Sequence, residues 1–432
     1  MSGARTVVRN LLPIIPKYLR MRRSQYANAA AIEAESHRRL EDALRAAAKL
    51  PFYRERFGAS GNTVDLRGCP ILKRSDIPAL NQSVRHQIGG AFFHENSSGS
   101  TGMPVEFLFD NEHQSGRYAA RIRYLRASGW SPLRRNAWIV ASTSRLDESP
   151  DARLVFSRLR MRSTFLRVIF RPFAEQVEAL LALSPEFLYT IPSNLDGLVE
   201  AFERRAVRLP SLRLIFTGGE VLDDSIRERA RRILGVEIRD NYGSTEAFIA
   251  WQCPAGSYHV NAEHVIVEIV DEANRPVAAG EMGRILITTL ENRLMPLIRY
   301  EIGDYAIASG DAVCSCGRTL PTIGRIIGRG INLFRMPDGR LVSPWPLVGP
   351  LKAHREIEQF QIVQESVDRF VVRYVSHQPL EISAQEHIRQ GFARILAIDA
   401  KVAFERMTSI ERTAGGKFMT ALSMLNAERV AL

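Results

Sequence analysis

The chain has 432 residues, of which 45% are hydrophobic and 24% charged, a composition typical of a globular protein that can bury a core. This length predicts two or three domains, and because no apolar run reaches about 18 residues we expect no stable membrane insertion. The net charge of +11 comes almost entirely from dispersed arginines without a recognised nucleic-acid motif, which favours an anionic small molecule over nucleic acid as partner.

The N-terminal segment is basic. Residues 1–32 contain no acidic side chain, and basic residues surround the apolar stretch Val7–Leu19. Such a pattern suits an interfacial segment or a targeting peptide. However, Pro13 and Pro16 interrupt it, and it has neither a long apolar region nor a small-residue cleavage site. We therefore expect an ordinary pair of basic helices in a cytoplasmic protein that is a monomer or homodimer.

Apolar residues at helical spacing predict a helix over residues 31–57. From there to about residue 325, predicted strands and helices alternate, which is typical of an α/β domain with a mixed, largely parallel sheet. The clearest examples are the strands Phe187–Ile191, Leu212–Phe216 and Val236–Asp240 and the helices Ser193–Arg204 and Asp223–Leu234. Two further strands, Val265–Val270 and Arg284–Thr289, flank a turn at Asn274–Pro276 and predict an antiparallel hairpin.

A domain boundary is expected near Gly328–Arg329. Residues 1–328 would form a large N-terminal domain with mixed sheets, and residues 329–432 a small α+β C-terminal lid. The lid is predicted from a compact β-β-α-β pattern: Gln359–Gln364, Arg369–Val375, Ala384–Leu396 and Lys401–Arg406.

The first candidate site is a run of hydroxyl residues and glycines, Ser97-Ser98-Gly99-Ser100-Thr101-Gly102-Met103-Pro104. Glycines permit left-handed turns, so successive N–H groups can converge on a polyphosphate, and the hydroxyls add donors. It is not a Walker P-loop, because no Gly-Lys-Ser/Thr sequence closes it. Taken alone, such a run is also typical of a flexible loop.

The second candidate, Asp240-Asn241-Tyr242-Gly243-Ser244-Thr245-Glu246, follows strand-like Val236–Arg239. The carboxyl ends of sheet strands are where α/β folds bind ligands. There an aromatic ring can stack on a base, a threonine can bond a phosphate and a carboxylate can hold Mg²⁺. The segment Phe216-Thr217-Gly218-Gly219-Glu220 repeats the strand-then-glycine arrangement, and plain β-turns would not need an acid at both places.

Two shorter signals lie further along. The carboxylate of Asp304, preceded by Gly303, could accept hydrogen bonds from both hydroxyls of a ribose. In Arg412-Thr413-Ala414-Gly415-Gly416-Lys417, a glycine-bracketed lysine could carry a compact cation to a phosphate. A common turn and a solvated loop lysine are the ordinary readings of these two signals.

Three of the four cysteines form a metal-binding pattern with a histidine. Cys253, His259, Cys314 and Cys316 supply four ligands, enough for a closed tetrahedral zinc site. Free buried thiols fit the spacing equally well, and His264 is the alternative imidazole. So few cysteines suit a reducing compartment.

Together these motifs resemble those of the adenylate-forming acyl-CoA synthetase superfamily. The resemblance rests on their order along the chain: SSGSTGMP, a glycine pair, YGSTE, GD, GR and RTAGGK. The segments Pro70–Asp76 and Cys314–Arg318 are similar to its phenylacetate–coenzyme A ligase branch. The resemblance covers roughly residues 35–420. It implies use of ATP and Mg²⁺ to activate a carboxylic acid, with an aryl or arylacetic acid favoured, and then acyl transfer to coenzyme A. Zinc-bearing members of this branch favour a structural Zn²⁺.

Carried over residue by residue, the resemblance implies that Ser97–Gly102 wraps the β- and γ-phosphates and that Thr245 touches the α-phosphate. Glu246 would hold Mg²⁺, Asp304 and Arg329 would bind the ribose, and Lys417 would bridge the substrate carboxylate and the α-phosphate. The adenine would be framed by Gly218, Gly219, Asn241 and Tyr242, with Glu220, Asp240, Gly243 and Ser244 as further nucleotide-binding candidates.

The sequence departs from the family pattern at two places, and the second of them concerns the acceptor more than the activation step. Met103 stands where many relatives have lysine, and Gly330-Ile331-Asn332 stands where paired acids usually follow the hinge. An amide-forming ligase, a carrier-protein loading enzyme and a protein that transfers AMP to a hydroxyl are therefore alternatives. A degenerate homologue that only binds nucleotide is the non-enzymatic alternative.

Overall fold

The computed structural model describes residues 13–57, 65–86, 92–97, 105–139, 162–166, 169–310, 313–410 and 419–426. The described chain divides into two compact units, the first ending at Ile326 and the second beginning at Ile327. The mixed α/β architecture expected from the sequence is confirmed. No helix among these residues combines the length and apolar character needed to cross a bilayer.

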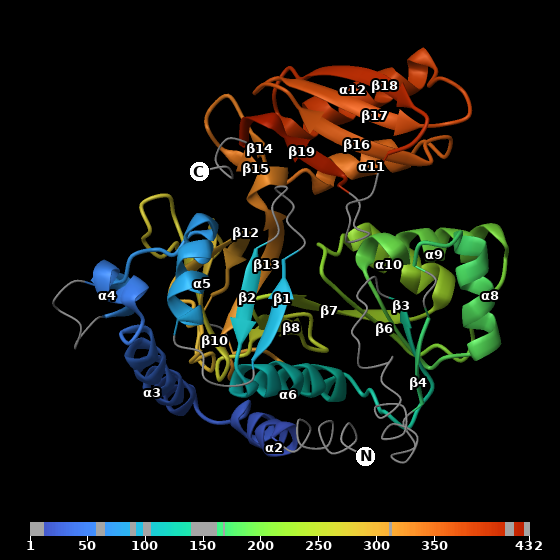
Figure 1. Cartoon of the computed structure of the whole chain (residues 1–432). Coiled ribbons are helices and arrows are strands. Elements are labelled where there is room, and N and C mark those ends of the chain that lie inside the picture. The colour runs from blue at the N-terminus through green and yellow to red at the C-terminus, as the bar shows by residue number, and fades with distance from the viewer. Residues whose placement is uncertain are drawn as a thin grey trace. The chain divides into compact units, whose positions relative to one another are not determined.

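The first unit is built on an eleven-stranded mixed sheet with the order β10-β11-β12-β13-β9-β8-β7-β6-β5-β3-β4 (Figure 1). The part β4-β3-β5-β6-β7 is parallel, and most of the remaining neighbours run antiparallel. The strands are β3 (Asn136–Ile139), β4 (Ser163–Phe165), β5 (Phe187–Thr190), β6 (Leu214–Gly218), β7 (Glu237–Gly243), β8 (Phe248–Gln252), β9 (Tyr258–Val260), β10 (Val265–Val270), β11 (Met282–Thr289), β12 (Tyr300–Ala308) and β13 (Thr322–Arg329). A short hairpin of β1 (Phe93–Asn96) and β2 (Glu106–Phe109) lies outside this sheet.

Helices cover both faces of the parallel strands. One face packs on α8 (Phe173–Leu183), α9 (Pro192–Arg204) and α10 (Asp224–Leu234), which lie together in Figure 1. The other face packs on α2 (Ile14–Ser24) and α6 (Asn111–Ala127). This burial of both faces explains the continuous apolar run of a strand such as β6.

The predicted elements differ from the structure mainly at their ends. The expected helix over 31–57 is two helices, α3 (Ala29–Ala47) and α4 (Pro51–Phe57), because Pro51 cannot continue the helix before it but suits the first turn of the next. β10 has the predicted bounds and pairs antiparallel with β11, as expected. β7 is longer than expected and runs through Asp240 to Gly243, so the first half of the second motif is strand rather than turn.

The second unit holds a four-stranded sheet with the order β18-β17-β16-β19. Its elements are β16 (Gln359–Gln364), β17 (Arg369–Val375), α12 (Ile382–Leu396), β18 (Lys401–Met407) and β19 (Ala421–Ser423), with small pieces β14 (Phe334–Arg335), β15 (Leu341–Val342) and α11 (Val348–Lys352). The predicted strands β16 and β17 are observed with the expected bounds. Apolar residues at helical spacing on α12, including Ile388 and Phe392, pack against Phe370 and Val372 of β17.

Candidate active site

Two of the predicted site residues meet inside the first unit. The hydroxyl of Tyr242, on β7, donates a hydrogen bond of 2.8 Å to Oδ2 of Asp304, on β12. Both side chains are buried. Gly303, just before Asp304, has a φ of 83°, a conformation that residues with a side chain rarely adopt. The glycine that the sequence places before this acid is therefore required by the backbone.

The glycine pair lies beside Asn241 at the carboxyl ends of β6 and β7. Gly218 is paired with Asn241 in parallel register, and a Cβ added at Gly218 would lie 2.4 Å from the Asn241 amide nitrogen. That amide donates to the carbonyl of Thr217 and, at 3.0 Å, to the hydroxyl of Tyr189. Gly219 follows with a φ of 85°. Only a glycine at position 218 leaves room for the Asn241 amide to lie this close to the backbone of β6.

Two predicted nucleotide-binding acids are engaged within the protein. The carboxylate of Asp240 accepts hydrogen bonds of 2.6 Å from the hydroxyls of Thr217 and Tyr258. Burial raises the pKa of Asp240, and these two hydrogen bonds oppose the rise. Glu220 accepts from the backbone N–H of Ser193 at 2.8 Å and from its hydroxyl at 3.1 Å, which satisfies an amide in the first turn of α9. Both acids therefore hold the turns in place.

Glu246 lies in the tight turn that joins β7 to β8. The turn is closed by a backbone hydrogen bond of 2.9 Å from Ser244 to Ala247, and Ser244 Oγ accepts from the Glu246 N–H at 3.2 Å. Glu246 is only 5% exposed, and its carboxylate has no hydrogen bond or ion pair to another described residue. Gly243, Ser244 and Thr245 of the same turn are half-buried. A buried carboxylate that pairs with no side chain of the described residues is suited to a cation.

A residue that the sequence did not single out supports this turn. His113 of α6 is fully buried, and its Nε2 lies 3.0 Å from the backbone carbonyl of Glu246. The two residues are 133 positions apart, so no local motif indicates the contact.

The serine-rich loop is described only at its base. Ser97 pairs with Val105 through backbone and side-chain hydrogen bonds, at 2.9 Å for Ser97 N to Val105 O and 3.2 Å for Val105 N to Ser97 Oγ. Arg74 Nη2 donates to the same hydroxyl at 2.8 Å. The other predicted residues of this loop, Ser98, Gly99, Ser100, Thr101 and Gly102, lie outside the described residues, as does Lys417.

Arg329 belongs to the second unit. It is the last residue of β13, is exposed, and precedes a turn of 3₁₀ helix at Gly330–Asn332. Gly328, before it, has a φ of 105°. The structure thus places Gly330–Asn332, where the resemblance leads us to expect a hinge, in a short, regular turn.

The four candidate zinc ligands come together in the first unit. The ligand atoms of Cys253, His259, Cys314 and Cys316 all lie within 4.8 Å of one another. His259 Nε2 is 3.3 Å from Cys316 Sγ, while its Nδ1 lies 3.3 Å from the carbonyl of Leu320. A hydrogen bond from Nδ1 to a carbonyl leaves Nε2 as the free lone pair, which is the usual arrangement at a metal-binding histidine.

Other features of the cluster also suit a metal. Burial lowers the pKa of His259, which keeps the imidazole neutral, as a metal ligand must be. The alternative imidazole, His264, is not part of the cluster: its Nδ1 lies 2.8 Å from a carboxylate oxygen of Glu291. That alternative is wrong, because His264 is committed to a different buried contact.

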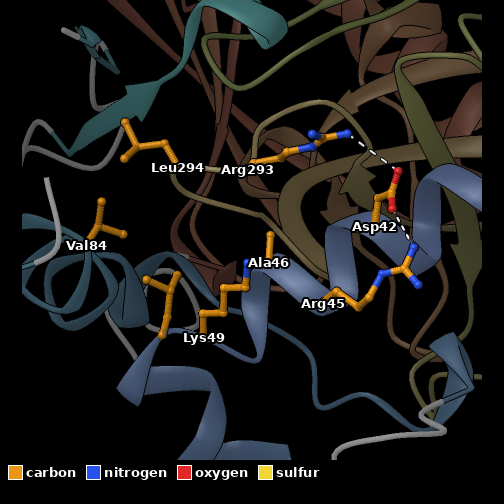
Figure 2. Close-up of a pocket in the computed structure, with 8 residues that line it drawn as sticks. Asp42, Arg45, Ala46, Lys49, Val84, Arg293 and Leu294 are labelled. Atoms are coloured by element: carbon orange, nitrogen blue, oxygen red, sulfur yellow. Dashed lines mark hydrogen bonds and ion pairs between the residues drawn. The ribbon is translucent and has the colours of Figure 1, made fainter. Parts of the chain in front are cut away.

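Figure 2 shows a surface groove whose lining residues belong to none of these motifs. Its volume is about 410 Å³, and none of the predicted site residues lines it. The carboxylate of Asp42 pairs with both Arg45 and Arg293, as the dashed lines in Figure 2 show, so a single negative charge offsets part of the positive charge of the lining residues. The lining residues are Asp42, Arg45, Ala46, Lys49, Leu50, Val84, Arg293 and Leu294.

Two family models match the chain. Residues 161–292 match the AMP-binding enzyme family, and residues 334–423 match the CapK C-terminal domain. The first match contains β6, β7 and two of the four clustered residues, Cys253 and His259, and the second contains the sheet of the second unit.

Curated relatives and a solved structure agree with these matches. A phenylacetate-coenzyme A ligase of Thermus thermophilus is 33% identical over 58% of this chain and 62% of its own length, so the chain spans less than two thirds of that relative. The enzyme of the same name from Escherichia coli is 25% identical over 78% of this chain and 76% of its length. A crystal structure of 2-hydroxyisobutyryl-CoA ligase with an acyl-adenylate has a TM-score of 0.73 at 20% identity, covers 95% of this chain and 93% of that one, and shows the shared fold.

Proposed function

We propose that the chain is a member of the adenylate-forming superfamily, in its phenylacetate–coenzyme A ligase branch, and acts as an AMP-forming acid–coenzyme A ligase. In this proposal the protein activates a carboxylic acid with ATP as an acyl-adenylate and then passes the acyl group to coenzyme A. The observation that carries it is the hydrogen bond from Tyr242 to Asp304, which joins two of the nucleotide motifs across the sheet.

In the first step, a carboxylate oxygen of the acid attacks the α-phosphorus of ATP. A new P–O bond forms, the bond between the α- and β-phosphates breaks, and pyrophosphate leaves. Like charges meet in this step, so cations that neutralise the growing charge lower the barrier. We assign Lys417 to the α-phosphate and the substrate carboxylate, Thr245 to the α-phosphate, and Ser97–Gly102 to the leaving phosphates.

We assign Mg²⁺ to Glu246. The support is the chemistry of the side chain: a buried carboxylate that bonds to no other described residue is a fitting ligand for a hard cation. The ion would neutralise phosphate charge during the first step. Tyr242, Asn241 and the glycine pair would bind the base, and Asp304 with Arg329 the ribose.

In the second step, the thiol of coenzyme A attacks the acyl carbon. A C–S bond forms, the bond from carbon to the AMP oxygen breaks, and the thiol proton passes to the solvent. Between the two steps, we propose that the second unit rotates, which moves Lys417 away and admits the thiol. This unit carries Arg329 and Lys417. An aryl or arylacetic acid is the proposed substrate class, in keeping with the names of the curated relatives.

We further propose a structural zinc ion at Cys253, His259, Cys314 and Cys316. The support is the convergence of the four ligand atoms and the carbonyl that orients His259. Because the protein would fill all four positions, the ion would brace the loops that carry these residues without entering the reaction. A cytoplasmic location fits the three reduced thiols that this site needs.

The proposal is tested by exchange of labelled pyrophosphate into ATP in the presence of a panel of carboxylic acids. We expect exchange that depends on an aryl or arylacetic acid and on Mg²⁺. Repeating the assay with coenzyme A, amines, hydroxyl compounds and carrier protein identifies the acceptor. A folded protein that binds ATP but shows no exchange with any acid would overturn the proposal in favour of nucleotide binding alone.

A further inference from the structure

Behind the turn that carries Glu246 lies a buried set of polar side chains that none of the steps above uses. Its first member is His113, whose side chain is 0% exposed and whose Nε2 lies 3.0 Å from the Glu246 carbonyl. A carbonyl can only accept, so Nε2 carries the hydrogen and His113 is the donor.

The ring of His113 is held on both sides. It stacks on Phe109, with centroids 4.9 Å apart and planes 8° apart, and it contacts the ring of His264 at 4.6 Å. Its backbone N–H donates at 2.8 Å to Asp110, the N-cap of α6. Neither the ring nor the helix turn beneath it can therefore move without disturbing several contacts.

The set continues from His264 to the N-terminal helices. His264 Nδ1 lies 2.8 Å from one oxygen of Glu291, and the other oxygen accepts from Lys17 of α2 at 2.9 Å and Arg39 of α3 at 3.1 Å. Burial alone would raise the pKa of Glu291, but His264 and Lys17 lower it to about 2. The carboxylate is thus a fixed negative charge behind His264.

Gly116 on α6 shows how closely this set is packed. A Cβ at this position would lie 1.7 Å from an oxygen of Glu291 and 3.0 Å from Nδ1 of His264. A glycine inside a helix costs about 1 kcal/mol relative to alanine. The glycine is required here so that α6 can approach the Glu291 carboxylate and the His264 ring.

We propose that His113 is a positioning residue for Glu246. By donating to the backbone carbonyl, it fixes the turn from behind, so that the Glu246 carboxylate is presented to the cation in one orientation. A metal ligand must be held within roughly 0.5 Å of its working position, and removal of the groups that hold ligands typically costs about 10–100-fold in metal affinity. The proposal rests on the assignment of Mg²⁺ to Glu246.

A pair of amide substitutions separates positioning from simple filling of space. In His113→Gln, the side-chain amide can reach the place of Nε2 and still donate to the carbonyl. In His113→Asn, the amide is too short to do so. We expect His113→Asn to raise the Mg²⁺ concentration for half-maximal pyrophosphate exchange by about 10–100-fold, and His113→Gln to restore most of the loss. The Michaelis constant for the acid should change little in either variant.

Tyr124→Phe is the matched control. Tyr124 lies on the same helix, is also fully buried, and donates at 2.7 Å to a backbone carbonyl, that of Arg239 in the middle of β7. Its loss should lower stability without changing the Mg²⁺ requirement. An unchanged Mg²⁺ requirement in His113→Asn, or an equal change in Tyr124→Phe, would overturn the positioning role.

Nucleotide binding gives a second measurement that needs no turnover. Calorimetric titration with ATP at a series of Mg²⁺ concentrations should show that ATP binding needs more Mg²⁺ in His113→Asn than in the wild type. In His113→Gln the Mg²⁺ requirement should return most of the way to the wild-type value. If the wild-type protein shows no acid-dependent exchange but its ATP binding depends on Mg²⁺ and responds to these variants, the activity assigned above fails while the positioning role stands. ATP binding that depends on Mg²⁺ but is equal in wild type and His113→Asn overturns the positioning role alone.

Discussion

The hydroxyl of Tyr242 lies 2.8 Å from Oδ2 of Asp304, although their strands, β7 and β12, are separated in the sheet by β8, β9 and β13. A flat sheet would keep strands that far apart about 19 Å from each other, at roughly 4.8 Å per step. The sheet must therefore bend sharply between them, and this bend brings the YGSTE and GD motifs to one place.

We expect Asp304→Ala to weaken ATP binding by about 10–100-fold, because a hydrogen bond to a charged group contributes roughly 1.5–3 kcal/mol. Tyr242→Phe should have a smaller effect, since it keeps the ring and the carboxylate but removes the hydrogen bond between them. Calorimetric titration with ATP distinguishes the two variants. Equal affinity in Asp304→Ala and wild type would remove Asp304 from the nucleotide site.

The sequence predicts the strands of the fold better than it predicts which groups the individual acidic side chains contact. β10, β16 and β17 have their predicted bounds because their apolar patterns and flanking turns are strong local signals. Asp240 and Glu220 accept hydrogen bonds from hydroxyls and an amide of other segments, and these contacts could not be read from the sequence; their role in nucleotide binding stays a prediction.

The same limit applies to the candidate site as a whole. Its motifs could be found because each is a continuous stretch of sequence, and the four zinc candidates could be found because cysteine is scarce in this chain. The support behind Glu246 could not be found, because His113, His264 and Glu291 come from separate segments and are isolated polar residues in sequence. Only the packing of α6 against the sheet shows that they meet.

Substitution of Gly218 tests whether the close approach of the Asn241 amide to the backbone of β6 matters for ATP binding. In Gly218→Ala the new Cβ would meet the Asn241 amide at 2.4 Å, so the amide must move and lose its hydrogen bonds to Thr217 and Tyr189. We expect weaker ATP binding and a stability loss of about 1–3 kcal/mol in urea unfolding. The control is Gly68→Ala, where a Cβ has no neighbour within 4 Å and φ is not in the left-handed region. Similar losses in both variants would contradict the assignment.

Lys417 is expected to act in the first step alone. Lys417→Ala should reduce acid-dependent pyrophosphate exchange by about 10²–10³-fold, since it removes a cation that neutralises charge as the carboxylate attacks. Conversion of a supplied acyl-adenylate, with coenzyme A present, should be much less affected. Lys401→Ala is a suitable control, because Lys401 is an exposed lysine of the same unit that pairs with Asp368 on the surface. Equal loss in both half-reactions would exclude the assigned role.

Elemental analysis tests the metal cluster. The purified protein should contain about one zinc per chain, and Cys316→Ser should lose it and unfold at a lower temperature. Cys69→Ala is the control, because Cys69 is buried like Cys253 but lies outside the cluster. It should keep the zinc. A folded wild-type protein without zinc would mean that these thiols serve only to fill space.

Glu291 predicts how stability depends on pH. Its pKa is lowered from 4.5 to about 2 in the folded protein, so the folded state binds fewer protons than the unfolded state between these values. The carboxylate therefore contributes stability that is fully present above pH 4.5 and is lost as the pH falls toward 2. A shift of this size corresponds to about 3 kcal/mol.

Urea unfolding of the wild type and of Glu291→Gln, at pH values from 6 down to 3, measures this contribution. The variant should be less stable at pH 6, because Lys17 and Arg39 keep their charges without the carboxylate, and its stability should fall less steeply below pH 4.5. Glu33→Gln removes an exposed carboxylate of α3 and should leave the slope unchanged. If Glu291→Gln and wild type lose stability in parallel, other buried carboxylates govern the acid sensitivity, and the charge behind His264 is not held as the structure indicates.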